Sequence, residues 1–406
     1  MDNTYQSPRW SAEALYCPNP LAFDQYSNCS HKCAYCFSQF QRLLIRGKGR
    51  QDYIENKANF VDIEKVKRIF LNKRPTQFSK YIEMKKLLQW GSLSDPFCHY
   101  EKKYNVGLEL LRFFREIDYP IVFGTKATWW IKDKRYSELF ENNKKWKVRI
   151  SLITTNNDLL MKLEKGTATV KERLSGLEYL KKINVGKVVL RMRPFIFGIS
   201  DLTHKELIRL GSKCGVDSIS LGFFCHDYRM AKDNSETIDL LTGFNQKEFY
   251  KNFTSNKGSP LRLNRNIKRD IINEVEELCI MNKIQFTVGD RHFKERSQID
   301  ISNNQTERCK GQFAQAASIC RINEIVKWAD ISWDMQHFEN VKTYLFNEKC
   351  ETTSQFFDFS VKDYFHYLWN NPNESRSPYK IFEGIMIPFD KDTNGDLIYK
   401  YNKERE

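Results

Sequence analysis

Three cysteines lie close together near the start of the chain, in the segment Cys29-Ser-His-Lys-Cys33-Ala-Tyr-Cys36. Three thiolates with this spacing on one loop can bind three irons of a 4Fe–4S cluster and leave the fourth iron open to another ligand. Structural zinc prefers four protein ligands, and the nearest extra ligand, His31, lies inside the loop and would distort it. The spacing therefore favours an iron–sulfur cluster with an open position over zinc.

The elements around this segment alternate between short apolar runs and helical stretches, from about residue 21 to residue 290. The strand candidates, several of them near-continuous and rich in Val, Ile and Phe as in buried parallel strands, are LAFDQY, LLQWGSL, IVFGTK, VRISLIT, VVLRMRPFI, SISLGFF and IQFTVGD. Two intervening helices begin at predicted capping boxes, Thr169 to Glu172 and Thr203 to Glu206. About six or seven such units predict an α/β fold with a full or partial parallel (β/α) barrel, in which chemistry sits at the carboxyl ends of the strands.

The same patterns predict three parts: an N-terminal extension over residues 1–20, the barrel over residues 21–300, and a mostly helical C-terminal extension over residues 301–406. The extension contains Cys309, Cys320 and Cys350, which are candidates for a second cluster or a zinc site. Scattered cysteines are more often small core residues, and this alternative stays open.

The cysteine spacing, with an aromatic residue directly before the last cysteine, resembles the radical S-adenosylmethionine superfamily. This resemblance implies an enzyme in which S-adenosylmethionine binds the open iron through its amino and carboxylate groups. An electron from the reduced cluster then cleaves it to methionine and a 5′-deoxyadenosyl radical. The resemblance also places Tyr35 against the adenine and implies a reductase or a flavodoxin-type protein as electron donor.

Further motifs over residues 20–300 resemble the spore photoproduct lyase branch, which includes DNA-repair-photolyase-like proteins. They are Gly91-Ser-Leu-Ser94-Asp95-Pro96-Phe97, Glu101-Lys-Lys-Tyr104, Thr125-Lys126 and Ser151. The resemblance implies that Ser94, Lys126 and Ser151 contact S-adenosylmethionine, and a lysine at the end of a strand can pair with its carboxylate. Leu93 stands where the lyase has the cysteine that returns a hydrogen atom to its product radical, which argues against photoproduct repair itself.

Arg191 and Arg193 lie two residues apart on one predicted strand and therefore face the same side. Inside a barrel they need anionic partners, because an unpaired buried charge is costly. The cofactor carboxylate, a substrate phosphate or an internal carboxylate would each serve, and we place both arginines among the cofactor-binding candidates. Candidates for catalysis are Cys98, which could donate hydrogen only if its loop folds back, and His226 and His292, which follow the last two predicted strands.

Lys and Arg together number 65, against 51 for Asp and Glu, so the net charge is +14. This surplus suits a polyanionic partner. Basic and aromatic residues are interleaved over residues 42–53, and basic residues recur over residues 257–269, as expected for segments that follow a phosphate backbone. The 11 cysteines, an odd number, indicate thiols or metal ligands rather than a disulfide framework.

No segment approaches the roughly 18 consecutive apolar residues of a membrane span, and the first residues lack a secretory signal pattern, so we expect a cytoplasmic protein. The sequence predicts a radical S-adenosylmethionine enzyme that modifies or repairs a nucleic-acid base. The alternatives are a radical S-adenosylmethionine enzyme acting on a peptide or protein, and a non-enzymatic nucleic-acid-binding protein with a structural metal.

Overall fold

The computed structural model describes residues 5–10, 21–38, 55, 57–227, 230, 232–251, 260–290, 293, 296, 312–331, 361–374, 377–382 and 384–405. Two compact units divide the chain. One comprises Met1–Arg9 and Leu21–Phe286, and the other comprises Trp10–Pro20 and Thr287–Glu406. The boundaries expected at residues 20 and 300 stay predictions.

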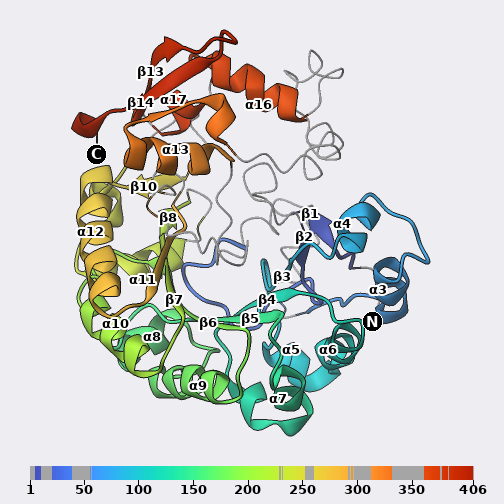
Figure 1. Cartoon of the computed structure of the whole chain (residues 1–406). Coiled ribbons are helices and arrows are strands. Elements are labelled where there is room, and N and C mark those ends of the chain that lie inside the picture. The colour runs from blue at the N-terminus through green and yellow to red at the C-terminus, as the bar shows by residue number, and fades with distance from the viewer. Residues whose placement is uncertain are drawn as a thin grey trace. The chain divides into compact units, whose positions relative to one another are not determined.

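An eight-stranded sheet has the order β1-β2-β3-β4-β5-β6-β7-β11, and its strands β2 to β7 belong to the first unit (Figure 1). Strands β2 to β7 each run parallel to the next. The order has two ends, β1 and β11, so the predicted parallel α/β barrel is confirmed in its partial, open form. The strands are β1 (Arg9–Trp10), β2 (Leu21–Phe23), β3 (Leu88–Trp90), β4 (Ile121–Thr125), β5 (Trp146–Ser151), β6 (Lys187–Phe195), β7 (Ser218–Phe223) and β11 (Gln285–Val288).

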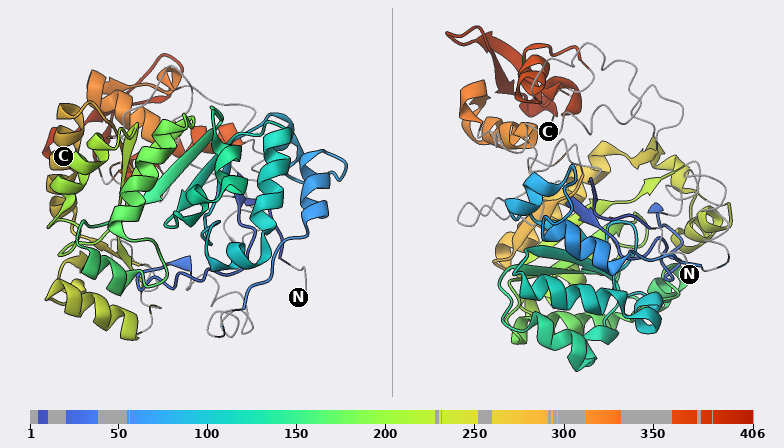
Figure 2. Two further views of the ribbon diagram at one scale, coloured as in Figure 1. Left: turned by 90° about the horizontal axis from the view of Figure 1, so that it is seen from below. Right: turned by 90° about the vertical axis from the view of Figure 1, so that its right-hand side faces the viewer.

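Helices connect these strands, and α6, α7, α9, α10 and α12 lie along the outer side of the curved sheet (Figure 1, Figure 2). The helices of this unit are α3 (Ile63–Phe70), α4 (Ser79–Glu83), α5 (His99–Tyr104), α6 (Val106–Glu116), α7 (Lys134–Phe140), α8 (Asn157–Leu163), α9 (Val170–Lys182), α10 (His204–Lys213), α11 (Lys232–Thr242) and α12 (Arg265–Met281). A smaller antiparallel sheet follows β7 and has the order β8 (Cys225–His226), β10 (Leu261–Leu263), β9 (Tyr250–Lys251).

One of the two predicted capping boxes forms. Thr169 and Glu172 cap α9 reciprocally. The box predicted at Thr203 and Glu206 is wrong, because both side chains bind Thr155 instead. Thr203 Oγ1 accepts the Thr155 N–H at 3.2 Å, and Glu206 accepts the Thr155 hydroxyl at 2.7 Å.

The two faces of the sheet differ in chemistry, because successive side chains along a strand alternate between faces. The outer face is apolar and contacts the helices. A Cβ added at Gly176 of α9 would lie 3.2 Å from Ile150, and one added at Gly211 of α10 would lie 2.7 Å from Leu190. Ile150 and Leu190 are fully buried. The helix glycines therefore allow close packing on this face.

Glu101 anchors the polypeptide before α6. Its carboxylate is fully buried and accepts the hydroxyls of Tyr26 and Tyr136, each at 2.7 Å. It also accepts the backbone N–H groups of Gly107 and Leu108, at 2.7 and 2.8 Å. This acidic side chain thus satisfies donors that the start of a helix leaves without a backbone acceptor.

The second unit joins helices α13 (Gln312–Asn323), α16 (Val361–Asn370) and α17 (Pro378–Ile381) to a three-stranded antiparallel sheet. The sheet order is β12 (Ile325–Val326), β14 (Leu397–Tyr401), β13 (Met386–Lys391). Its core includes Phe313, Phe365, Trp369 and Tyr399. The expected helical extension therefore also contains a sheet, whose short strands carry no strong pattern. Among the described residues, none of the helices has the length and apolar character needed to cross a membrane.

Candidate metal centre and cofactor site

The three cysteines of the first motif lie on a loop at the carboxyl end of β2. Cys33 is buried, while Cys29 and Cys36 are partly exposed. Lys32 adopts a left-handed backbone conformation, with φ of 50°, and turns the chain between the first two cysteines. The Cys36 N–H donates to the Cys33 carbonyl at 3.1 Å. The loop therefore presents three thiols from one short, turned segment.

The end of α8 and the segment that follows it hold this loop in place. The Ala34 N–H donates to the Leu163 carbonyl at 2.9 Å, and His31 Nδ1 lies 2.6 Å from the Gly166 carbonyl. The Tyr35 hydroxyl donates to Glu164. A Cβ at Gly166 would lie 3.0 Å from the Cα of His31, so glycine is what permits this close approach. No sequence motif indicates this support, because the two segments are far apart in the chain and share no pattern.

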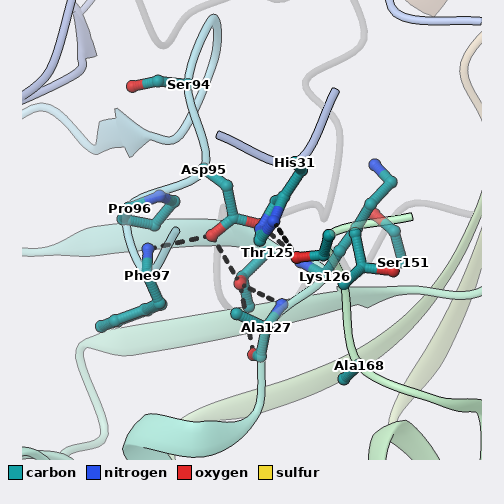
Figure 3. A network of polar contacts seen from close by, with 12 residues as sticks. His31, Ser94, Asp95, Pro96, Phe97, Thr125, Lys126, Ala127, Ser151 and Ala168 are labelled. Atoms are coloured by element: carbon teal, nitrogen blue, oxygen red, sulfur yellow. Dashed lines mark hydrogen bonds and ion pairs between the residues drawn. The ribbon is translucent and has the colours of Figure 1, made fainter. Parts of the chain in front are cut away.

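A polar network joins the cysteine loop to the ends of β3 and β4 (Figure 3). Buried Asp95 accepts the Thr125 hydroxyl at 2.8 Å and the N–H groups of Lys126 and Phe97 at 2.6 and 2.9 Å. His31 Nε2 lies 3.2 Å from Asp95 Oδ2, an ion-pair distance. Burial would lower the pKa of His31, but the Asp95 carboxylate and the Cys29 thiol raise it to about 9. His31 is thus directed at Asp95 and Gly166.

The same network sets the charge of Asp95. Burial alone would raise the pKa of this carboxyl, but His31 and the N–H groups of Lys126 and Phe97 hold it below its usual range. Asp95 belongs to a motif that carries the resemblance, yet nothing in its local sequence indicates that it binds His31. A polar residue at the carboxyl end of a strand was the available signal.

Lys126 and Tyr35 lie together at the carboxyl end of β4. The Lys126 ammonium lies over the Tyr35 ring, 5.7 Å from its centroid. Within the described part of the chain, this ammonium forms no ion pair with a carboxylate. Its charge also favours the thiolate of Cys33, although burial raises the pKa of that thiol well above its usual value. The lysine is therefore placed to attract an anionic group beside the cysteine loop.

The two predicted serines differ in what their hydroxyls do. The Ser94 hydroxyl donates to the Tyr26 carbonyl at 3.1 Å, and its N–H donates to Asp24 at 2.8 Å. Its side chain points away from the Asp95 network (Figure 3). Ser151 is buried at the end of β5, and its hydroxyl has no hydrogen-bond partner among the described residues. Ser94 thus orders its own loop, whereas Ser151 keeps a hydroxyl available for a ligand.

The two predicted arginines on β6 share one face but lean in opposite directions. A Cβ at Gly124 of β4 would lie 3.3 Å from a guanidinium nitrogen of Arg191, so Arg191 reaches across β5 toward the strand that ends beside Lys126. A Cβ at Gly222 of β7 would lie 3.0 Å from Cδ of Arg193. Arg191 is therefore directed to the Lys126 side and Arg193 to the opposite side.

The two candidate catalytic side chains that the structure describes, Cys98 and His226, are buried. Cys98 is fully buried, and a hydrogen bond with its thiol, together with burial, raises the pKa of Cys29 well above its usual value. His226 lies in β8, where Nε2 is 3.0 Å from the Ser235 hydroxyl, and burial lowers its pKa. His292 lies outside the described residues.

The other predicted ligands and basic segments are only partly described. Cys320 is buried in the core of the second unit and donates to the Tyr399 carbonyl at 3.5 Å. Cys309 and Cys350 lie outside the described residues. The basic segment 42–53 also lies outside them. In the other basic segment, Lys268 is 2% exposed and lies 5.7 Å from the Phe223 ring centroid. Lys268 is therefore a packed side chain, and its predicted place on a phosphate-facing surface is wrong.

The donors of the cysteine loop fit an iron–sulfur cluster. Three soft thiolate donors on one loop, with a cation beside them, match the ligands that such clusters take. No three His, Cys, Asp or Glu side chains in the described ranges converge to hold a single ion. A 4Fe–4S cluster does not need such convergence, because each cysteine binds a different iron.

The comparisons with known proteins concern the fold. No family model matches the chain, and no curated protein matches it. A cysteine-to-serine variant of spore photoproduct lyase matches with a TM-score of 0.50 at 15% identity, over 70% of this chain and 79% of the other. A variant of the same lyase with bound AdoMet and dinucleoside spore photoproduct gives 0.49 at 14% identity, over 70% and 78%. Streptococcus suis SuiB bound to S-adenosylmethionine gives 0.43 at 15% identity, over 67% and 51%. The chain therefore has the fold of spore photoproduct lyase, and the resemblance that its motifs indicated is confirmed at the level of the fold.

Proposed function

We propose that this protein is a radical S-adenosylmethionine enzyme that modifies or repairs a nucleic-acid base. The observation that carries the proposal is the position of the Cys29, Cys33 and Cys36 loop beside the Lys126 ammonium, at the carboxyl ends of neighbouring parallel strands. Binding sites of open α/β folds occur at this edge of the sheet. When bound, a 4Fe–4S cluster at the three cysteines would supply the electron that cleaves S-adenosylmethionine to methionine and a 5′-deoxyadenosyl radical.

The residues of this chain would bind and orient the cofactor. Lys126 and Arg191 offer positive charge to the methionine carboxylate, because a charge-assisted hydrogen bond is stronger than a neutral one. The Ser151 hydroxyl can donate to the carboxylate or accept from the amino or ribose groups. The Tyr35 ring, fixed by its hydroxyl bond to Glu164, supplies an aromatic surface for the adenine.

The base substrate is supported by the net charge of +14 and by the cations on the inner face of the sheet. Photoproduct repair in the manner of the lyase is not proposed, since Leu93 stands at the position of its hydrogen-donating cysteine. The Cys98 thiol is fully buried and hydrogen-bonded to the Cys29 thiol, so it does not offer an accessible hydrogen donor in place of that cysteine. A second metal site at Cys309, Cys320 and Cys350, a flavodoxin-type or reductase donor and a cytoplasmic location stay predictions.

Anaerobic reconstitution tests this proposal. The parent protein should bind about four irons per chain. After reduction it should produce 5′-deoxyadenosine from S-adenosylmethionine, faster with a pool of DNA or RNA oligonucleotides than without. Cys33→Ala should lose the iron and the product, whereas Cys214→Ala, which removes a buried thiol on the other side of the sheet, should keep both.

Each alternative has its own signature in this experiment. If a peptide pool accelerates the formation of 5′-deoxyadenosine and oligonucleotides do not, the protein is a peptide-modifying enzyme instead. One firmly bound zinc and no cleavage of S-adenosylmethionine would leave a nucleic-acid-binding protein with a structural metal. Full iron content and cleavage in Cys33→Ala would contradict the proposed cluster site.

A further inference from the structure

The inner face of the sheet carries an unusual set of charges. The strand register places Lys147 opposite Lys187, Arg149 opposite Val189, and Ser151 opposite Arg191. Residues opposite one another share a face, so the inner side of β5 and β6 presents Lys147, Arg149, Lys187 and Arg191, followed by Arg193 over Gly222. Interiors of closed parallel barrels are normally filled by branched apolar residues. These two adjacent strands instead bring five cations to the inner face.

The strands themselves bring no carboxylate to this face. The inner positions on β2, β3, β4 and β7 are Ala22, Gln89, Val122, Gly124, Ser218, Ser220 and Gly222, and none of the paired inner positions from β2 to β7 is Asp or Glu. The proposed cofactor adds one carboxylate but also an ammonium and a sulfonium group, so it does not lower the positive charge. A surface lined by charge of one sign attracts ligands of the opposite sign.

Exposure along the two strands shows where an anion can reach this face. Lys147 and Lys187, at the amino ends, are buried, and the Lys187 ammonium donates to Gln285. Arg149, Arg191 and Arg193, toward the carboxyl ends, are partly exposed. The accessible cations thus lie at the edge of the sheet where the cysteine loop also lies.

Arg193 is the cation with the clearest room for a ligand. It has no hydrogen-bond or ion-pair partner in the part of the chain that the structure describes, and Gly222 makes space for its side chain along β7. Ser220 lies one inner position before Gly222 on β7, and its buried hydroxyl is also without a partner among the described residues. Because Arg193 leans away from Lys126, its ligand is distinct from the cofactor carboxylate.

We propose that Arg193, with Ser220 beside it, binds a backbone phosphate of a single-stranded nucleic acid whose base enters the open sheet. This inference rests on the proposed function and names how its substrate is held. An arginine fork matches the geometry of a phosphate and can donate two parallel hydrogen bonds to it. The phosphate would lie on the β7 side and leave the Lys126 side to the cofactor.

Binding of a fluorescein-labelled single-stranded oligodeoxynucleotide, measured by anisotropy at several salt concentrations, tests the proposal without reduction or turnover. Arg193→Gln should weaken binding and lower the slope of log affinity against log salt by roughly 0.7 for the one phosphate that is no longer neutralised. Arg193→Lys should keep most of the salt slope but reduce the affinity, because an ammonium cannot bind in a bidentate manner. Arg209→Gln, a control on the exposed side of α10, should change neither. An oligonucleotide with neutral methylphosphonate linkages should bind the parent at least as weakly as the charged one binds Arg193→Gln.

The outcomes separate this proposal from the proposed function. If the parent binds the oligonucleotide and Arg193→Gln shows the same salt slope, the phosphate site is wrong and the function stands. If Arg193→Gln instead weakens S-adenosylmethionine binding and leaves the oligonucleotide unaffected, Arg193 is a cofactor contact and the proposal is overturned. If the folded parent cleaves S-adenosylmethionine but binds no nucleic acid at low salt, the nucleic-acid substrate fails together with this site.

Discussion

Glu164 and Arg173 form an ion pair with an oxygen–nitrogen distance of 2.5 Å, and neither side chain is exposed to solvent. Glu164 also accepts the Tyr35 hydroxyl, and Arg173 donates to the Ser151 carbonyl at 2.7 Å. One buried pair therefore connects the cysteine loop to the carboxyl end of β5. The residues that we propose for the cluster and for the cofactor share this support.

Glu164→Gln should destabilise the folded protein by about 3–5 kcal/mol, because it leaves the Arg173 charge buried without its counterion. Urea unfolding at neutral pH measures this change. The control is Glu64→Gln, which breaks an exposed ion pair of 2.8 Å with Lys67 in α3 and should cost no more than about 1 kcal/mol. Equal effects of the two substitutions would show that the buried pair contributes no more than a surface pair.

Lys126→Ala should weaken S-adenosylmethionine binding by about 1.5–3 kcal/mol, which is roughly 10- to 150-fold in the dissociation constant. The reason is the loss of the cation that we place against the cofactor carboxylate. Equilibrium dialysis with the reconstituted protein measures the affinity. Lys102→Ala removes another lysine that lies over an aromatic ring, 5.2 Å from the Trp129 centroid, and should leave the affinity unchanged. An unchanged affinity in Lys126→Ala would remove this residue from the cofactor site.

Glu101→Ala should lower the free energy of unfolding by more than about 3 kcal/mol, because two backbone N–H groups and two tyrosine hydroxyls lose a buried acceptor. Glu109→Ala, on the exposed side of the neighbouring helix α6, is the matched control and should change stability by less than about 0.5 kcal/mol. Thermal and urea unfolding of both variants give the comparison. A small change in the free energy of unfolding of Glu101→Ala would mean that water accepts these hydrogen bonds in place of the carboxylate.

Three cysteines should resist alkylation in the folded protein. Burial raises the pKa of Cys214, Cys279 and Cys320 to about 12, and a nearby glutamate adds to this effect at Cys214 and Cys279. At pH 8 only about one molecule in 10⁴ would carry a given thiolate. Iodoacetamide labelling followed by mass spectrometry should therefore modify them only after unfolding, whereas the partly exposed Cys225 should react in the native protein. Native labelling of Cys320 at the rate of Cys225 would contradict this.

The same thiols give a stability that depends on pH in a definite direction. Their folded pKa lies above the unfolded value of about 8.5, so the unfolded chain releases these protons first as pH rises. Their contribution is complete below about pH 8.5 and is lost between that pH and about 12.

The sequence predicted well those features that depend on local spacing. The parallel α/β sheet and the shared face of Arg191 and Arg193 follow from periodicity along single segments, and the metal-binding loop follows from the spacing of its cysteines. The opposite lean of the two arginines did not, because it depends on Gly124 and Gly222 in strands that are not adjacent in sequence. Periodicity reports which face a side chain occupies and says nothing about its neighbours on other strands.

Side-chain partners from distant segments also explain the remaining differences. Ser94 is predicted to contact the cofactor, and its hydroxyl donates to the Tyr26 carbonyl, a partner that the local sequence does not indicate. Thr203 has the right spacing for a capping box, but Thr155 offers it a different bond. In both cases the local sequence is compatible with more than one hydrogen-bond partner, and the fold determines which partner lies within reach.

The attachment of the cysteine loop to the segment after α8 has a consequence for how the protein is made. Ala34 and His31 are held by Leu163 and Gly166, so the contacts that fix the loop join residues about 130 positions apart in the chain. A ribosome adds roughly 5–20 residues per second, so the thiols near residue 30 emerge many seconds before the segment that orders them. During that interval the three cysteines belong to an unsupported peptide. We expect the metal to be loaded only after the segment that follows α8 has been synthesised, and truncated chains that end before α8 should not retain iron.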